Sequence, residues 1–190
     1  MAQELGVKHS ANPETGEEVV MTTDFFITIS TTKGIKEVAR TIKSKDDLLY
    51  KRVIEKFEIE REFWKRKDVD WAIVTEEEID KVMAHNISFI QGYRDIKSVD
   101  GFNVMEPYDI QDLIYEFMRR IVDNNRSVRR ISSEFDSDMD LPIGSGLSIF
   151  KFLLINKVIT IDILKEINVN NIIPIISINN EQIKKVEKIC

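Results

Sequence analysis

The chain has 190 residues, of which 43% are hydrophobic and 32% charged, and its formal net charge is -6. This length can bury a hydrophobic core in one domain or in two small ones. The net negative charge argues against sequence-blind wrapping of nucleic acid, which relies on a broad basic surface. No apolar run approaches the roughly 18 residues of a membrane helix, and no signal peptide is evident. The sequence therefore predicts a cytoplasmic protein without membrane contact.

The single cysteine, Cys190, excludes an intrachain disulfide and a cysteine-based zinc site. Residues 36–67 carry four more basic than acidic side chains, in contrast to the rest of the chain. Two interpretations of this local surplus stay open. It either contacts DNA or a partner, with Lys45 among the candidates, or it is the solvated face of a charged helix.

Two strands joined by a tight turn are predicted near the N-terminus. After about twenty residues of loop-like sequence, segments 19–21 and 25–29 are rich in β-branched and aromatic side chains. A turn at 32–34 then returns the chain into a strand over 35–43. These segments predict a β-hairpin.

A long helix and a buried strand are predicted after the hairpin. The helix is expected over 44–67, where it begins with a capping box and carries an apolar stripe that includes Glu60. The apolar segment 71–74 is typical of a buried strand, and a second capping box at 75–78 predicts a short helix. This order predicts an α/β domain with a mixed sheet over residues 1–96.

A second, smaller domain is predicted over residues 97–190. Glycine, proline and polar residues mark the boundary, and the elements that follow resemble a helix-turn-helix with a small wing. The expected helices cover 108–122, 128–135 and 147–156, and the β-rich segments cover 157–164 and 172–178. The apolar side chains from Leu147 to Leu154 are most simply interpreted as domain core.

A candidate catalytic group stands where the hairpin strands begin and end. Asp24 precedes the first strand, and Thr41 and Lys43 end the second, sharing one strand face because they are two residues apart. A hairpin brings Asp24 alongside them. Aspartate is an oxygen ligand for Mg²⁺, and lysine can stabilise charge that develops on a phosphate, so the pattern fits phosphodiester hydrolysis. The same spacing also fits an ordinary strand with an aspartate at its edge and a solvated lysine at its end.

Two other polar residues have two interpretations each. Glu60 should face the sheet, where it borders the site. Alternatively, it extends to the surface or pairs with a neighbouring base such as Lys56 or Arg61. His9 either contacts substrate or orders the loop before Asp24, or it is simply an exposed loop histidine.

An arginine cluster lies across a helix end and the following turn in the second domain. It contains Arg119, Arg120, Arg126, Arg129 and Arg130. These side chains could meet phosphates or an acidic partner, although helix C-termini attract arginines through the macrodipole without any ligand. An acidic run at 136–140 opposes the cluster, and partner docking is therefore favoured over base reading.

Several segments resemble the TnsA family of transposon endonucleases. These segments are 5–9, 21–25, 41–43, 54–64 and 71–79, and the resemblance extends over about residues 1–90. It implies a restriction-endonuclease-like fold that cuts one DNA strand at each transposon end beside a TnsB-like transposase. It also implies a winged-helix C-terminal domain that contacts other transposition proteins, including a TnsC-like ATPase regulator.

The resemblance assigns roles to three residues. Asp24 matches the metal-binding aspartate, Lys43 matches the catalytic lysine, and Thr41 takes a metal-site position at which TnsA proteins commonly carry glutamine. The implied cofactor is Mg²⁺. The family draws a further catalytic glutamate from an upstream helix, and no residue here matches it. Because one carboxylate seldom holds Mg²⁺ well, the site is expected to be incomplete.

Three functions follow as hypotheses. The leading one is the endonuclease subunit of a heteromeric transposase, which hydrolyses the non-transferred strand at transposon ends. The alternative is a catalytically incomplete component that docks DNA or proteins in the transposition complex. A stand-alone restriction or repair nuclease of the same fold is the third.

Overall fold

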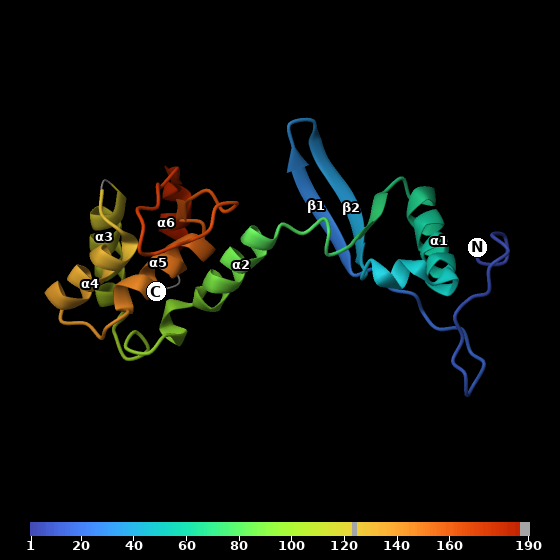
Figure 1. Cartoon of the computed structure of the whole chain (residues 1–190), viewed down its shortest axis with the longest axis horizontal. Helices are drawn as coiled ribbons and strands as arrows, with labels where there is room; N and C mark the ends of the chain where they lie inside the picture. Colours follow the sequence, from blue (N-terminus) through green and yellow to red (C-terminus); the bar gives the residue numbers. More distant parts are fainter. Residues whose placement is uncertain (123–124, 187–190) are drawn as a thin grey trace. The chain divides into compact units, whose positions relative to one another are not determined.

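The computed structural model describes residues 1–122 and 125–186 (Figure 1). The chain forms two compact units, Met1–Ile79 and a second that begins at Asp80. This division precedes the expected boundary at residue 96 because helix α2 (Lys81–Ile90) packs against helix α5 (Ser145–Ile155) of the second unit. Within the described ranges, no helix is long and apolar enough to cross a bilayer.

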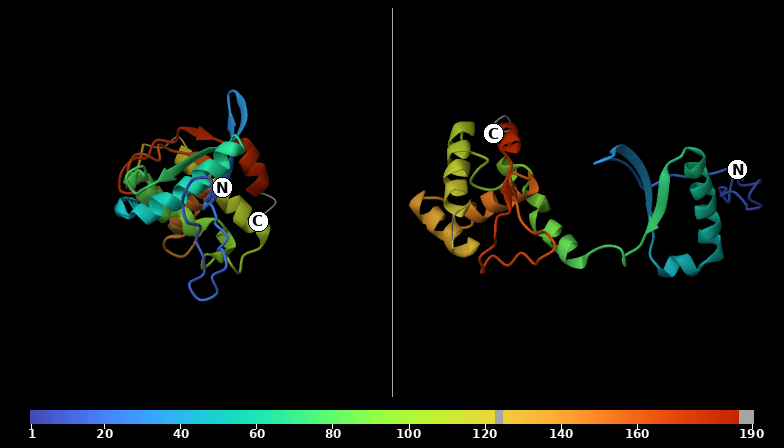
Figure 2. Two further views of the ribbon diagram at one scale, coloured as in Figure 1. Left: turned by 90° about the vertical axis from the view of Figure 1, so that its right-hand side faces the viewer. Right: turned by 90° about the horizontal axis from the view of Figure 1, so that it is seen from above.

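The first unit contains the predicted mixed sheet. Strands β1 (Phe25–Thr31) and β2 (Gly34–Ile42) are antiparallel, and β2 is parallel to β3 (Asp70–Val74). Helix α1 (Lys51–Arg66) forms the crossover between the two parallel strands. Its side chains cover one face of the sheet, where the rings of Phe26 and Trp64 stack with centroids 5.2 Å apart. The α/β class with a mixed sheet is confirmed, and the hairpin tip extends beyond α1 (Figures 1 and 2).

Three local expectations in this unit are wrong. Segment 19–21 is not a strand, because its pairing with residues 10–11 ends after the isolated bridge between Ala11 and Glu18 and the Val19 N–H bond to the Ser10 carbonyl; Val20 is 84% exposed. The long helix starts at Lys51, after a 3₁₀ turn η1 (Asp46–Leu49), since Tyr50 has an extended backbone. The carboxylate of Asp47 pairs with Lys43 instead of forming the expected capping box.

The second capping box is present in part. Glu78 accepts hydrogen bonds from the Thr75 backbone N–H and hydroxyl, at 2.6 and 2.7 Å. The helix, however, begins only at Lys81, because the Asp80 side chain caps the Met83 N–H. The Thr75–Glu78 contact therefore forms a turn between β3 and α2.

The second unit is mainly helical, and its three predicted helices are confirmed within three residues at each end. They are α3 (Pro107–Val122), α4 (Val128–Asp138) and α5, preceded by the 3₁₀ turns η2 (Gln91–Tyr93) and η3 (Ile96–Ser98). The two predicted β-rich segments contain only the short strands β4 (Ile159–Thr160) and β5 (Ser177–Ile178). Helix α6 (Asn180–Val186) was not predicted.

The loop between β4 and β5 makes few strand contacts because its backbone bonds elsewhere. The fully buried Asn86 side chain donates to the carbonyls of Ile163 and Lys165 and accepts from the Ile167 N–H. The carbonyl of Val169 accepts from the Arg129 N–H at the start of α4. These bonds replace the ladder that a longer wing would need.

The core of the second unit lies among α3, α4 and α5. The apolar stripe of α5 is confirmed as core, since Ile149, Phe150 and Leu153 have no exposed surface. Helices α4 and α5 approach closely at Gly146, where an added Cβ would lie 3.0 Å from the Ser132 backbone. Tight apolar packing therefore defines this unit.

Candidate functional site

The hairpin register places Asp24 beside the end of β2. Phe25 pairs with Arg40, so Asp24 lies directly beyond the last pair and opposite Thr41. The exposed Asp24 carboxylate accepts a hydrogen bond from the Ile42 N–H at 2.7 Å through Oδ2. Its Oδ1 has no hydrogen bond to any residue that the structure describes. One oxygen is thus fixed by the backbone, and the other faces solvent.

Lys43 lies at the same end of the sheet. Its backbone N–H donates to the Val74 carbonyl at 3.0 Å, which continues the parallel pairing of β2 with β3. Its Nζ lies 3.0 Å from Asp47 Oδ2, and both side chains are partly exposed. The ammonium is therefore held by the Asp47 carboxylate of η1.

Thr41 faces away from solvent, toward α1. Its side chain is buried, and its hydroxyl donates to Glu60 Oε1 at 2.6 Å. The same hydroxyl oxygen accepts from Trp71 Nε1 at 3.2 Å. These two bonds orient Thr41 within the interface between the sheet and α1.

Glu60 is the centre of a buried polar network. Its Oε1 accepts from the Thr23 hydroxyl at 2.5 Å, from Thr41 at 2.6 Å and from Trp71 Nε1 at 3.2 Å. Trp64 Nε1 donates in turn to the Thr23 hydroxyl at 2.8 Å. Since Thr23 precedes Asp24 and Thr41 precedes Ile42, the network ties together the two backbone segments that hold the Asp24 carboxylate.

The expectation that Glu60 faces the sheet is confirmed, whereas the alternative interpretation, in which it pairs with Lys56 or Arg61, is wrong. Arg61 instead binds Glu58 in a bidentate contact, and this pair lowers the pKa of Glu58. Hydroxyl and indole donors bind Oε1 of Glu60, because α1 packs this residue onto β2 and β3. Sequence reasoning missed Thr23, Trp64 and Trp71. The available signal was the position of Trp64, one turn after Glu60 on the same stripe.

The described residues do not form a complete site for Mg²⁺. Within residues 1–122 and 125–186, no three histidine, cysteine, aspartate or glutamate side chains lie close enough to hold a metal ion. Asp24 offers one exposed carboxylate, and the Thr41 hydroxyl is turned to Glu60. Because Mg²⁺ needs several oxygen ligands in octahedral geometry, these two residues alone do not fit it.

Lys45 and His9 lie near other polar groups. Lys45 Nζ pairs with Glu77 at 2.5 Å, and the hydrogen bond to this carboxylate raises the pKa of Lys45. His9 Nδ1 lies 3.0 Å from the Ser10 carbonyl oxygen, and its ring lines a hollow next to Glu60. Their suggested contacts with substrate stay predictions.

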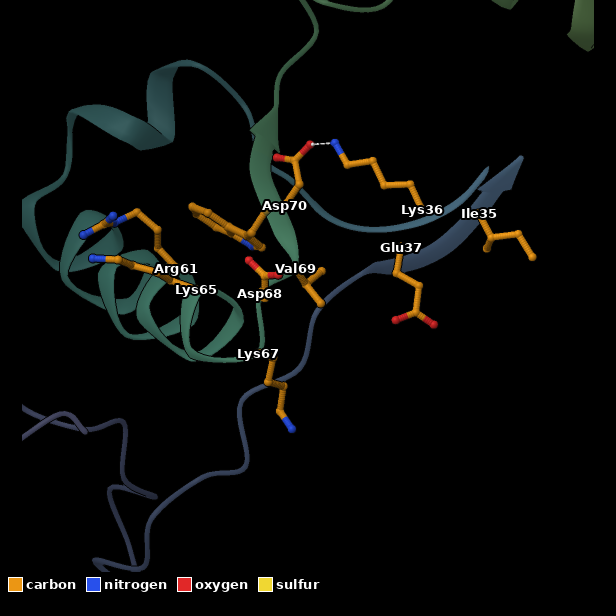
Figure 3. Close-up of a pocket in the computed structure, with 10 residues that line it drawn as sticks. Ile35, Lys36, Glu37, Arg61, Lys65, Lys67, Asp68, Val69 and Asp70 are labelled. Carbon is orange, nitrogen blue, oxygen red and sulfur yellow. Dashed lines mark hydrogen bonds and ion pairs between the residues drawn. The ribbon is translucent and has the colours of Figure 1, made fainter. Parts of the chain in front are cut away.

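The basic surplus of residues 36–67 is largely neutralised locally. A hollow of about 830 Å³ lies between α1 and the start of β3, and at its edge Lys36 bonds Asp70 at 2.8 Å. Figure 3 shows the residues that line it. Lys36 and then Arg40 hold the pKa of Asp70 below its usual range. Arg61 and Lys65 project from α1 on the opposite side of this hollow (Figure 3). The surface therefore alternates in sign and does not form a continuous basic track.

The arginines of the second unit are also engaged within it. Arg126 and Arg130 both bind Glu134, and Arg129 Nε donates to Asn170 Oδ1 at 2.6 Å. Hydrogen bonding to Arg130 lowers the pKa of Glu134. These contacts anchor α4 to its surroundings, and a DNA or partner contact at the arginines stays a prediction.

Comparison with known proteins agrees with this arrangement. Residues 1–76 match the family model of the TnsA-like endonuclease N terminal, and residues 78–163 match that of the TnsA endonuclease C terminal. The "Transposon Tn7 transposition protein TnsA" of Escherichia coli is 25% identical over 170 residues, or 90% of this chain. The chain spans 59% of the length of that relative. It therefore belongs to the TnsA-type transposon endonuclease family.

Proposed function

We propose that this chain is the endonuclease component of a heteromeric transposase and hydrolyses the non-transferred strand of DNA at transposon ends. One observation carries the proposal: strand pairing brings the Asp24 carboxylate and Lys43 to the same end of the sheet. Membership of the TnsA family and the relative's name, a transposition protein, support this role. The proposed substrate is therefore duplex DNA at a transposon end.

The proposed roles follow from what each side chain can do. Lys43 exchanges Asp47 for a phosphate oxygen and stabilises the negative charge that develops during hydrolysis. Asp24 keeps Oδ1 for a cation or a water, while the Ile42 N–H holds Oδ2. Mg²⁺, the proposed cofactor, needs oxygen ligands in addition to Asp24. Thr41 serves as a support of the strand end instead of a ligand.

Glu60 has a positioning role in this proposal. Its Oε1 joins Thr23 to Thr41 and so limits movement of Asp24 relative to the end of β2. Catalytic groups need placement within about 0.5 Å, which a buried network supports better than a loop alone. Glu60 therefore acts on the site without touching DNA.

For the second unit we propose a winged-helix-like module that docks partners. The order α3, α4, α5, β4 and β5 fits such a module. Helix α5, at the position of a recognition helix, packs against α2 and η2 and buries most of its side chains. Base reading by α5 is therefore disfavoured, and docking to a TnsB-like transposase or a TnsC-like ATPase is favoured.

A second candidate function is a docking component without nuclease activity. The observation that favours it is the lack of a metal-binding cluster, since among the described residues no three histidine, cysteine, aspartate or glutamate side chains lie close enough to hold a metal ion. In that case Asp24 would hold the Ile42 N–H as a structural contact only.

A cleavage assay separates the candidates. The full chain is incubated with a TnsB-like transposase, a transposon-end duplex and MgCl₂, and Mg²⁺ binding is measured in parallel by calorimetry. We expect Asp24→Asn and Lys43→Gln to reduce cleavage by roughly 100-fold or more. Lys33→Gln, in the hairpin turn, is the matched control and should cut normally.

Each other outcome has a definite meaning. Unchanged cleavage in Asp24→Asn would refute the catalytic assignment. Assembly with the transposase without cleavage or Mg²⁺ binding by the parent chain would identify the docking component. Cleavage without any transposase would identify a stand-alone nuclease.

A further inference from the structure

Glu60 has an oxygen that the hydrogen-bond network does not use. The residue is 7% exposed, and Thr23, Thr41 and Trp71 all donate to Oε1. Oε2 accepts no hydrogen bond, and no lysine, arginine or histidine forms an ion pair with Glu60, within the part of the chain that the structure describes. Oε1 thus carries all the hydrogen bonds of this carboxylate, while Oε2 is open to a ligand of opposite charge.

Glu60 lines a hollow of about 830 Å³ on the side of α1 that faces the N-terminal segment. Its wall is part apolar and part polar, and the polar part includes His9 and a second carboxylate, Glu18. The rings of Phe26 and Phe63 lie 5.2 and 5.0 Å from the ring of Trp64, and all three rings line the hollow. The α-amino group of Met1, which also borders the hollow, lies near Glu4. Aromatic rings around a buried carboxylate are suited to a cation with a hydrocarbon stem.

We infer that this hollow binds a guanidinium group on an alkyl stem, with the guanidinium paired to Glu60 Oε2 and the stem against Phe63 and Trp64. A guanidinium suits the site better than an ammonium, because it is planar, stacks on aromatic rings and is more weakly hydrated. The source is either an arginine side chain of a protein segment or a free alkylguanidine. Glu60 and Thr23 also support the Asp24 segment in the proposed function, but binding to the hollow is measured without DNA and without cleavage.

The test uses butylguanidinium and its neutral counterpart butylurea on the full 190-residue chain. The two tryptophans, Trp64 and Trp71, give two indole N–H signals in a nitrogen-15 correlation spectrum, assigned with Trp64→Phe. We expect saturable shifts of both signals with butylguanidinium in the millimolar range. Butylurea lacks the charge, so its affinity should be lower by about tenfold or more.

Two variants identify the carboxylate. Glu60→Gln keeps an acceptor for Thr23 and Thr41 and removes the charge, so butylguanidinium affinity should fall about tenfold or more. Glu62→Gln is the matched control. Glu62 lies on the same helix but pairs with Arg66, so its substitution should leave the butylguanidinium affinity unchanged. Should Glu60→Gln lose its indole signal dispersion, Phe63→Ala offers a second variant, because Phe63 is 40% exposed and lines the hollow. It should weaken binding several-fold.

The outcomes decide both the site and its source. Equal binding of butylurea, or unchanged affinity in Glu60→Gln or in Phe63→Ala, would overturn the inference. Absence of saturable shifts would do the same. Tighter binding of N-acetyl-arginine methylamide than of butylguanidinium identifies a protein segment as the source, whereas weaker binding identifies a free alkylguanidine. Loss of cleavage without loss of butylguanidinium binding would affect the proposed function alone.

Discussion

Each of the two units is stabilised internally in a different way. The second unit buries fully apolar side chains such as Phe117, Phe135 and Phe150 in one cluster. The described part of the first unit buries only three hydrophobic residues, and with them Thr41, Glu60 and Thr75. The three hydrophobic ones are Val38, Ala39 and Ile59. Apolar burial is non-directional and supplies stability, whereas a hydrogen-bonded network specifies geometry. The unit with the candidate site is thus the one with the smaller apolar core.

The largest expected effect comes from the apolar core of the second unit. Phe150→Ala should destabilise the protein by about 3–5 kcal/mol, because it removes a fully buried ring and leaves a cavity. The measurement is chemical denaturation followed by far-UV circular dichroism. Ile143→Ala is the control, since Ile143 is fully exposed and should change stability by less than about 0.5 kcal/mol.

Tryptophan fluorescence sharpens this prediction, because both tryptophans belong to the first unit. If the units unfold independently, Phe150→Ala shifts the circular dichroism transition and leaves the fluorescence midpoint unchanged. An equal shift of both would show that the two units unfold together.

A smaller effect is expected at the contact between α4 and α5. In Gly146→Ala the added Cβ would lie 3.0 Å from Ser132 backbone atoms and 3.1 Å from the Phe117 ring. This overpacking should cost roughly 1–3 kcal/mol. Gly92→Ala is a matched control with no atom within 4 Å of the added Cβ. Both variants are compared by thermal unfolding. Equal destabilisation of Gly146→Ala and Gly92→Ala would contradict the close approach of the helices.

In the first unit, Thr41→Val tests the polar network. It removes the donor to Glu60 and the acceptor for Trp71, so we expect a loss of about 1–2 kcal/mol in the fluorescence-monitored transition. In the double variant Thr41→Val with Glu60→Leu, part of this loss should be recovered, since an apolar pair leaves fewer unsatisfied groups. Strictly additive losses would show that the two residues do not interact.

The smallest effect is expected from the ion pairs of Asp70. Lys36 and Arg40 hold the pKa of Asp70 below its usual value of about 3.8, so the pairing stabilises the fold above that pH and is lost as the pH falls below it. Because the groups are partly exposed, the difference between the parent and Asp70→Asn should stay below about 1 kcal/mol at pH 7. Urea denaturation at pH 7 and near pH 3 checks this. A difference that grows toward pH 3 would have the wrong sign.

Local sequence patterns predicted most elements of the chain. The strands over 25–29 and 71–74 and the three helices of the second unit were found because their apolar side chains recur with the period of the element. Strand parity and the hairpin turn also predicted that Asp24 would lie beside Thr41. The failures were at 19–21, where no strand ladder forms, and at the first capping box, where Asp47 binds Lys43 instead. At the second box the Thr75–Glu78 contact forms, but the helix begins later, at Lys81.

By itself, the sequence determined the type and order of the elements, the hairpin that aligns Asp24 with the end of β2, and the apolar stripe of α5. These depend on contacts between residues near each other in the chain or on simple periodicity. Only the tertiary structure decided that Thr41 turns to Glu60 and that α2 covers α5. Both outcomes depend on how distant segments pack, because burial on a particular neighbour decides which polar group finds which partner.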